Sequence, residues 1–186
     1  PIDHLLTMID ARLQTVRTVG DAGLSEAQLD GVERLAHRLA RSDTWTTQPM
    51  TLIHGDLTPV NILAESDRSL VIIDLGNVRH GFALEDLARL WTSVWEIAQT
   101  TAWRRRWLGS AMEVLIAGVG QPHAVIDSEP FTFLRLWNGV TRLHEAATSA
   151  RRYRPPAAKL HRALLIHHIR YLRALAAEGD ARRRAA

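Results

Sequence analysis

The sequence predicts a mainly α-helical protein with one small β-hairpin near its middle. Apolar residues recur at helical spacing over most of the 186 residues. Two short apolar runs, at 62–64 and 70–73, flank a polar turn at 65–69, which is the pattern of a hairpin. The polar groups of chemical interest gather around this hairpin. We therefore expect a helical scaffold whose function depends on a small β element.

Two helices are expected ahead of the hairpin. The first covers residues 2–18, where the apolar residues fall on one helical face: Ile2, Leu5, Leu6, Ile9, Leu13 and Val16. The second covers residues 26–41, and Ser25 with Gln28 three residues later forms the pattern of a capping box. A polar connector then leads to a short candidate strand at 50–53.

The chain after Gly81 is expected to be helical again. The helical periodicity predicts four helices, at 84–99, 101–117, 130–149 and 156–177. Glycine and proline at 118–122 and two prolines at 155–156 separate them. Residues 179–186 are expected to be a frayed tail.

The composition is that of a soluble globular protein, with 46% hydrophobic and 23% charged residues. No apolar run approaches the roughly 20 residues that span a bilayer, so no membrane association is expected. Cysteine is absent, which excludes disulfides and thiolate metal sites and fits a reducing compartment. We expect a cytoplasmic protein.

The charge is distributed unevenly along the chain. Residues 1–100 carry 8 arginines and 14 acidic residues, whereas residues 101–186 carry 15 basic and 6 acidic residues. Solvated helix faces explain this pattern, and so does an anionic partner. Nucleic-acid binding is disfavoured, because the basic half has no interleaved aromatic platform and no known motif.

The stretch TLIHGDLTPVNIL, residues 51–63, contains the most informative polar residues. Asn61 precedes the first hairpin strand and Asp74 follows the second, so an antiparallel pairing should bring them together. Asp56 lies in the loop that feeds the hairpin and can reach the same place. Two carboxylates and an amide oxygen are ligands that suit Mg²⁺. Each of these residues also has a purely structural interpretation. Asp and Asn are common in turns, and an isolated histidine such as His54 is typically a buried residue with its hydrogen bonds satisfied.

Together, these residues resemble a known family. The segments HGDLTPVNIL and IIDLGNVRHGFALEDLARL are similar to the two signatures of the aminoglycoside phosphotransferase and choline kinase group. That group shares the protein-kinase fold, whose catalytic loop reads His-Arg-Asp-x-x-x-x-Asn and is followed by Asp-Phe-Gly. Here Gly55 stands in place of the arginine, and the interval from Asp56 to Asn61 is the same.

The resemblance implies a role for each matching residue. Asp56 would be the catalytic aspartate that accepts or orients the proton of the acceptor hydroxyl. Asn61 and Asp74 would hold Mg²⁺ against the phosphates of ATP or GTP. His54 and Asp86 would support the loop.

Three positions depart from the family pattern without removing a ligand. Thr58 stands where the family often has a second histidine, and Val60 where it often has glycine. Leu75 stands where it often has tryptophan or phenylalanine. These departures put a close relationship to any one characterised member in doubt.

The resemblance also implies that this chain is a single domain, the C-terminal lobe of such a kinase. Residues 1–49 would be leading helices, 50–88 the catalytic loop and metal-site hairpin, and 89–178 the helical acceptor side. The N-terminal nucleotide lobe should supply a lysine, yet no lysine precedes the loop and Lys159 is the only one in the sequence. The chain alone is therefore expected to be inactive. A longer parent protein, a natural loss of the lobe and a second polypeptide remain open as explanations.

The expected function is transfer of a nucleoside triphosphate's γ-phosphoryl group to a hydroxyl of a small molecule. Few carboxylates stand among the fifteen basic residues of 101–186, so the acceptor is expected to be neutral or anionic. The alternative is a non-catalytic binding or interaction module derived from the kinase lobe. Such a lobe would expose an apolar face that invites self-association.

Overall fold

The structure is a computed structural model that describes residues 1–19, 24–66, 69–100, 110, 117, 125–149, 171 and 174. Packing divides the chain into two compact units. The first, here the helical unit, contains residues 1–42 and 136–186, and the second, here the loop unit, contains residues 43–135. The single domain expected from the sequence stays a prediction.

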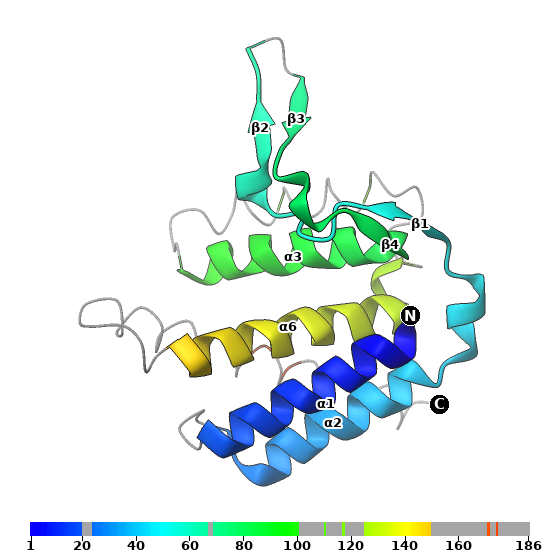
Figure 1. Ribbon diagram of the computed structural model, residues 1–186, viewed down its shortest axis with the longest axis vertical. Helices are drawn as coiled ribbons and strands as arrows, with labels where there is room; N and C mark the ends of the chain where they lie inside the picture. Colours follow the sequence, from blue (N-terminus) through cyan, green and yellow to red (C-terminus); the bar gives the residue numbers. More distant parts are fainter. Residues whose placement is uncertain are drawn as a thin grey trace. The chain divides into compact units, whose positions relative to one another are not determined.

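The helical unit contains an antiparallel pair of helices, α1 (Ile2–Val19) and α2 (Glu26–Ala40), which lie side by side (Figure 1). Both confirm the predicted helices. Their apolar stripes form the core of this unit, with these side chains buried: Leu5, Ile9, Leu13, Val16, Leu29, Val32, Leu35, Ala36 and Leu39. The predicted capping box is present at the start of α2, where the backbone N–H of Ser25 donates to Gln28 Oε1 at 2.9 Å.

Arg17 on α1 forms ion pairs with acidic side chains of α2. Its guanidinium donates to Glu26 at 3.2 Å, to Asp30 at 2.8 Å and to Glu33 at 2.7 Å. The hydrogen bond to Glu33 is the main cause of a raised pKa of Arg17. This network gives α1 and α2 a polar contact beside their apolar one.

The second half of α6 (Glu129–Ser149) also belongs to the helical unit. Arg12 on α1 donates to Thr141 Oγ1 at 2.9 Å, and its guanidinium lies 4.1 Å from the centre of the Trp137 ring. These contacts are a hydrogen bond to Thr141 and a cation–π interaction with Trp137. They join α1 to α6 within the same unit.

The loop unit contains two separate two-stranded antiparallel sheets. β2 (Ile62–Ala64) pairs with β3 (Leu70–Ile72), which confirms the predicted hairpin. β1 (Met50–Ile53) confirms the predicted strand and pairs with β4 (Arg79–Phe82), which the sequence did not predict. The residues of β4, Arg-His-Gly-Phe, have no apolar alternation, and their extended conformation depends on the partner strand. Short 3₁₀ turns cover Asp43–Thr47, Pro59–Asn61 and Leu75–Asn77.

α3 (Ala83–Thr100) follows β4, and the β2–β3 hairpin projects away from it (Figure 1). Aromatic rings pack the core of this unit: Trp45 lies 4.8 Å from Phe82 and 5.5 Å from Phe133, and Trp91 lies 6.0 Å from Phe131. The helices predicted at 84–99 and 130–149 are confirmed by α3 and α6. Those predicted at 101–117 and 156–177 lie outside the described residues, apart from positions 110, 117, 171 and 174. Within the described part of the chain, no helix is long and apolar enough to cross a bilayer.

Candidate functional site

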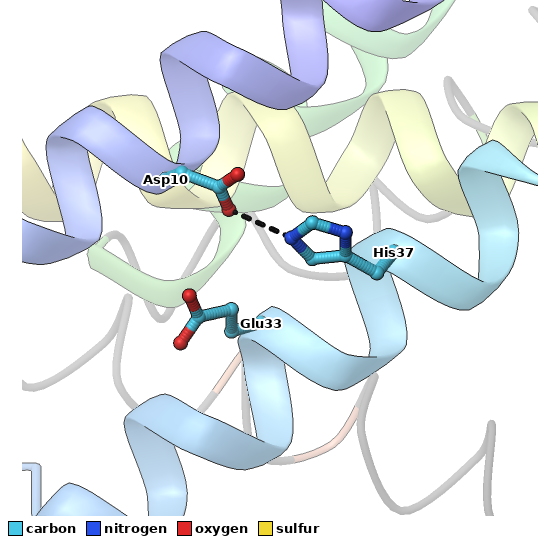
Figure 2. Close-up of side chains that lie close together, drawn as sticks. All are labelled: Asp10, Glu33 and His37. Atoms are coloured by element: carbon cyan, nitrogen blue, oxygen red, sulfur yellow. Dashed lines mark hydrogen bonds and ion pairs between the residues drawn. The ribbon is translucent and has the colours of Figure 1, made fainter.

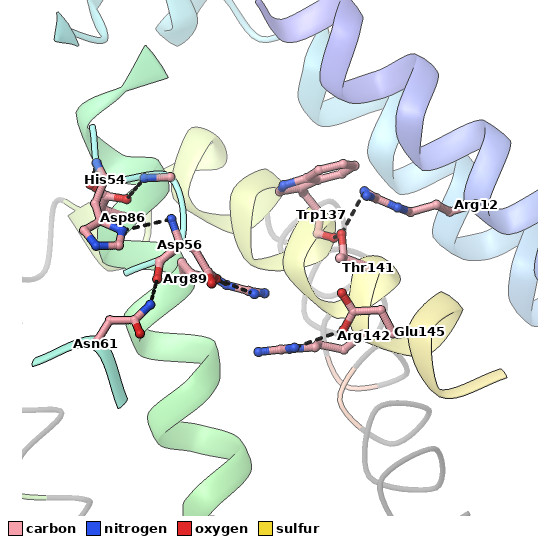
Figure 3. A network of polar contacts seen from close by, with 11 residues as sticks. Arg12, His54, Asp56, Asn61, Asp86, Arg89, Trp137, Thr141, Arg142 and Glu145 are labelled. Carbon is pink, nitrogen blue, oxygen red and sulfur yellow. Dashed lines mark hydrogen bonds and ion pairs between the residues drawn. The ribbon is translucent and has the colours of Figure 1, made fainter. Parts of the chain in front are cut away.

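The loop from His54 to Asn61 connects β1 to β2. The side chain of Asp86 on α3 binds the first residues of this loop. Asp86 lies in the first turn of α3, and its carboxylate accepts two backbone hydrogen bonds from the loop (Figure 3). The N–H of His54 donates to Oδ2 at 2.7 Å, and the N–H of Gly55 donates to Oδ1 at 2.9 Å. Both carboxylate oxygens are thereby used to fix the start of the loop.

Glu85, the residue before Asp86, fixes the corner between β4 and α3. Its buried carboxylate accepts a hydrogen bond from the backbone N–H of Phe82 at 2.9 Å. The other oxygen of Glu85 forms an ion pair with Arg79 on β4. Because the corner is fixed, the position of Asp86 relative to the loop is fixed as well.

His54 links the loop to the end of the hairpin. Its ring is buried, its Nδ1 accepts from the backbone N–H of Asp56 at 3.3 Å, and its Nε2 lies 2.8 Å from the carbonyl oxygen of Ile73. These two contacts are consistent with the tautomer that carries its proton on Nε2. A histidine with both ring nitrogens occupied in this way holds the loop in shape.

Asn61 joins the loop to both neighbouring segments. Its side-chain Nδ2 donates to the carbonyl oxygen of Asp56 at 2.9 Å (Figure 3). Its own carbonyl oxygen accepts from the N–H of Ile73 at 3.0 Å, which places the backbone of Asn61 beside the residue that precedes Asp74. The structure therefore brings Asp56 and Asn61 into contact, and brings Asp74 to the same end of the hairpin through the backbone.

Two residues of the site adopt left-handed backbone conformations. Gly55 has φ +80°, and a Cβ at this position would overlap the carbonyl oxygen of Asn77. Asp74 has φ 62° and is the one non-glycine residue with positive φ in the described part of the chain. Glycine adopts this conformation readily, whereas for a non-glycine residue such as Asp74 it costs free energy and is concentrated at functional sites. The close approach of the Asn77 carbonyl oxygen explains why residue 55 carries no side chain.

Arg89 forms an ion pair with Asp56. Its Nε and Nη2 both donate to Asp56 Oδ1, at 2.9 and 2.7 Å (Figure 3). The sequence analysis did not predict a role for Arg89, although its spacing from Asp86 indicates one. Arg89 follows Asp86 by three positions, so both side chains project from the same face of α3. If Asp86 reaches the loop, Arg89 can reach it one turn further along.

Apolar side chains around the site are exposed. Between positions 50 and 78, ten large apolar residues are exposed: Met50, Leu52, Val60, Leu63, Leu70, Val71, Ile72, Ile73, Leu75 and Val78. They come from β1, from the hairpin and from the turns beside it. Where exposed apolar residues form a large patch, they mark an interaction site. We refer to these ten residues as the apolar rim.

In a comparison with protein families, residues 6–113 match the model of a phosphotransferase enzyme family. The matched region is more than half of the chain and includes β1, the loop, the hairpin and α3. No curated protein and no solved structure matches the chain.

Proposed function

This chain belongs to the phosphotransferase enzyme family, and on that premise we propose that it transfers the γ-phosphoryl group of ATP or GTP to a hydroxyl group of a small molecule. The main support is the arrangement of the loop. Asp86 holds its start through two backbone hydrogen bonds, and Asn61 holds its end against Asp56. A catalytic loop needs such fixed geometry, because phosphoryl transfer depends mainly on positioning and charge stabilisation.

In this proposal Asp56 receives or orients the proton of the acceptor hydroxyl. Within the described part of the chain, Arg89 engages Oδ1 of this carboxylate, so Oδ2 is the oxygen that would face the hydroxyl. His54 and Asp86 position the loop and do not touch the reacting atoms. They act through the backbone of residues 54–56.

Asn61 and Asp74 are proposed to hold Mg²⁺, which would neutralise charge on the phosphates when bound. Their donor chemistry fits this ion, since both offer hard oxygen atoms. The Asn61 amide nitrogen donates to the Asp56 carbonyl, so the amide oxygen is the atom that would ligate. The left-handed backbone of Asp74 is consistent with a carboxylate held in place at some energetic cost.

The nucleotide's remaining contacts are proposed to come from outside these 186 residues. The sequence has no lysine ahead of the loop that could pair with the phosphates. The apolar rim is a surface against which a nucleotide lobe could pack, from the same polypeptide or from another. Without that lobe we expect the rim to promote self-association and the chain to lack activity.

The acceptor is proposed to be a neutral or anionic compound with a free hydroxyl group. Residues 101–186 hold 15 basic and 6 acidic residues, a balance that disfavours a polycationic acceptor. Tight, salt-sensitive binding of an aminoglycoside to the intact protein would contradict this part of the proposal.

A second candidate function is that of a non-catalytic interaction module. The observation that favours it is the ion pair between Arg89 and Asp56, because it already occupies one oxygen of the proposed catalytic carboxylate. In that case the loop would be a preserved structural feature and the apolar rim the functional surface.

The two candidates differ in an assay of phosphoryl transfer. The intact natural protein would be incubated with Mg·ATP or Mg·GTP and a panel of neutral and anionic hydroxyl compounds, and phosphorylated products followed by ³¹P NMR. Asp56→Asn should abolish turnover while folding is retained, because asparagine keeps an oxygen that can accept from Arg89 and the loss should stay within about 1–3 kcal/mol. Glu65→Gln, which changes an exposed carboxylate on the hairpin turn, is the matched control. Normal turnover by the Asp56 variant would refute the assignment.

A further inference from the structure

Three potential metal ligands converge in the helical unit, apart from the loop and its hairpin. Asp10 projects from α1, and Glu33 and His37 project from α2 (Figure 2). One ligand atom from each residue can be chosen so that all three lie within 4.8 Å of one another. The side chains point toward a common region between the two helices (Figure 2). The proposed phosphotransferase chemistry uses none of them.

The backbone positions of these ligands are fixed by the core. Glu33 and His37 are four residues apart, so they share one face of α2. Each ligand directly follows a residue packed in the core between the helices: Ile9, Val32 and Ala36 are 0%, 2% and 0% exposed. The three Cα atoms therefore keep their spacing, and only side-chain rotations are needed to adjust the ligand atoms.

The distance between two of the ligands already suits a bound ion. His37 Nε2 and Asp10 Oδ1 are joined by a hydrogen bond of 3.2 Å, which an ion bound between them would replace. Two ligands of a tetrahedral zinc ion, each about 2.0–2.2 Å from the metal, lie roughly 3.4 Å apart. A rotamer change of Glu33 would bring its carboxylate to the same spacing. The three side chains are 34–38% exposed, so water can occupy a fourth position.

We propose that Asp10, Glu33 and His37 form a binding site for Zn²⁺, which would link α1 to α2. Histidine nitrogen and carboxylate oxygen both ligate zinc, and three protein ligands leave a fourth position open for water. Mg²⁺ and Ca²⁺ prefer oxygen ligands throughout, so the histidine directs the site toward a transition-metal ion. This site is independent of the proposed function, because its three ligands all belong to the helical unit.

Arg17 competes with the metal for Glu33. Its guanidinium lies 2.7 Å from one Glu33 oxygen and also binds Asp30 and Glu26. Because Asp30 and Glu26 remain as partners, Glu33 can turn toward the metal without leaving Arg17 unpaired. Removing the competing charge should strengthen binding, so Arg17→Gln is expected to raise the affinity for Zn²⁺.

The test is a Zn²⁺ titration of the full chain, produced without a histidine tag and followed by calorimetry. We expect one ion per chain, and Co²⁺ should give the visible absorption of a low-coordinate site. His37→Gln and Asp10→Asn should each weaken binding by more than about tenfold, since even outer-shell partners are worth about 10- to 100-fold in metal affinity. His4→Gln removes an exposed histidine of α1 outside the cluster and should leave the affinity unchanged.

Several results would overturn the proposal. It fails if the wild-type chain binds no Zn²⁺ at millimolar concentration, or if His37→Gln binds as tightly as the wild type. It also fails if His4→Gln weakens binding as much as His37→Gln, since the site would then lie elsewhere. Far-UV circular dichroism of each variant establishes that its helices are retained. No nucleotide is present, so the outcome is independent of phosphoryl transfer.

Discussion

Arg89 donates two hydrogen bonds to one carboxylate oxygen of Asp56, from Nε at 2.9 Å and from Nη2 at 2.7 Å. The arginine side chain is 16% exposed and the aspartate side chain 31%, so water screens the pair only in part. Two donors on a single oxygen fix the rotation of the carboxylate. Arg89 is therefore a positioning residue for the proposed catalytic group, one helical turn beyond the residue that holds the loop.

Replacing Arg89 tests this positioning role. Arg89→Gln should lower kcat of the intact protein by about 10- to 100-fold with a small change in KM, because a misplaced catalytic group slows the reaction more than it weakens binding. Arg89→Lys should restore part of the loss, since lysine keeps the charge but lacks the planar fork. The cost in stability should be about 1–3 kcal/mol, because water screens the pair only in part. Steady-state kinetics and urea unfolding measure both effects. An unchanged kcat in Arg89→Gln would remove the residue from the mechanism.

Asp86 is expected to be a main support of the loop. Asp86→Ala leaves the N–H groups of His54 and Gly55 without their carboxylate partner, which should cost about 2–4 kcal/mol of unfolding free energy. Asp86→Asn keeps one acceptor oxygen and should cost less. Urea denaturation of the two variants gives the comparison. Equal, small losses in both would show that the loop is held by other contacts.

Local features of the site could be predicted from the sequence. The apolar runs on either side of a polar turn predict the β2–β3 hairpin, and the antiparallel pairing then brings Asn61 close to Asp74. The helical stripe of α1 and the capping box at Ser25 were also readable, since both depend on neighbours within a few residues.

Contacts between distant segments could not be predicted in the same way. β4 is extended because β1 lies beside it, and its own residues give no alternation. The pair of Arg89 with Asp56 joins residues 33 positions apart, and that of His37 with Asp10 joins residues 27 apart. Each depends on how elements pack, which periodicity within one element does not determine. The spacing of Arg89 from Asp86 indicates a contact with the loop only when Asp86 is known to bind the loop.

Two glycines offer a matched test of backbone conformation. Gly55→Ala should destabilise the protein by about 2–3 kcal/mol, because φ is +80° there and the added Cβ meets the Asn77 carbonyl oxygen. Gly31 lies within α2, and apart from its chain neighbours and the adjacent helix backbone no atom would lie within 4 Å of an added Cβ. Gly31→Ala should therefore stabilise the protein by up to about 1 kcal/mol. Thermal unfolding of the two variants should show shifts of opposite sign. A Gly55→Ala protein as stable as the wild type would contradict the loop conformation.

His144 should make the stability of the chain depend on pH. Burial lowers the pKa of His144, the charge of Arg12 lowers it further, and Glu145 acts in the opposite direction. The unfolded chain, with an ordinary histidine pKa of about 6.5, therefore binds this proton more readily than the folded chain does. By linkage the contribution of His144 to stability is fully present above about pH 6.5 and falls as the pH drops below it.

Urea unfolding at about pH 7.5 and about pH 5.5 should show a larger loss of stability in the wild type than in His144→Gln. The exposed His4 provides the control, since His4→Gln should keep the wild-type difference. An equal loss in His144→Gln and in the wild type would mean that other groups cause the acid destabilisation.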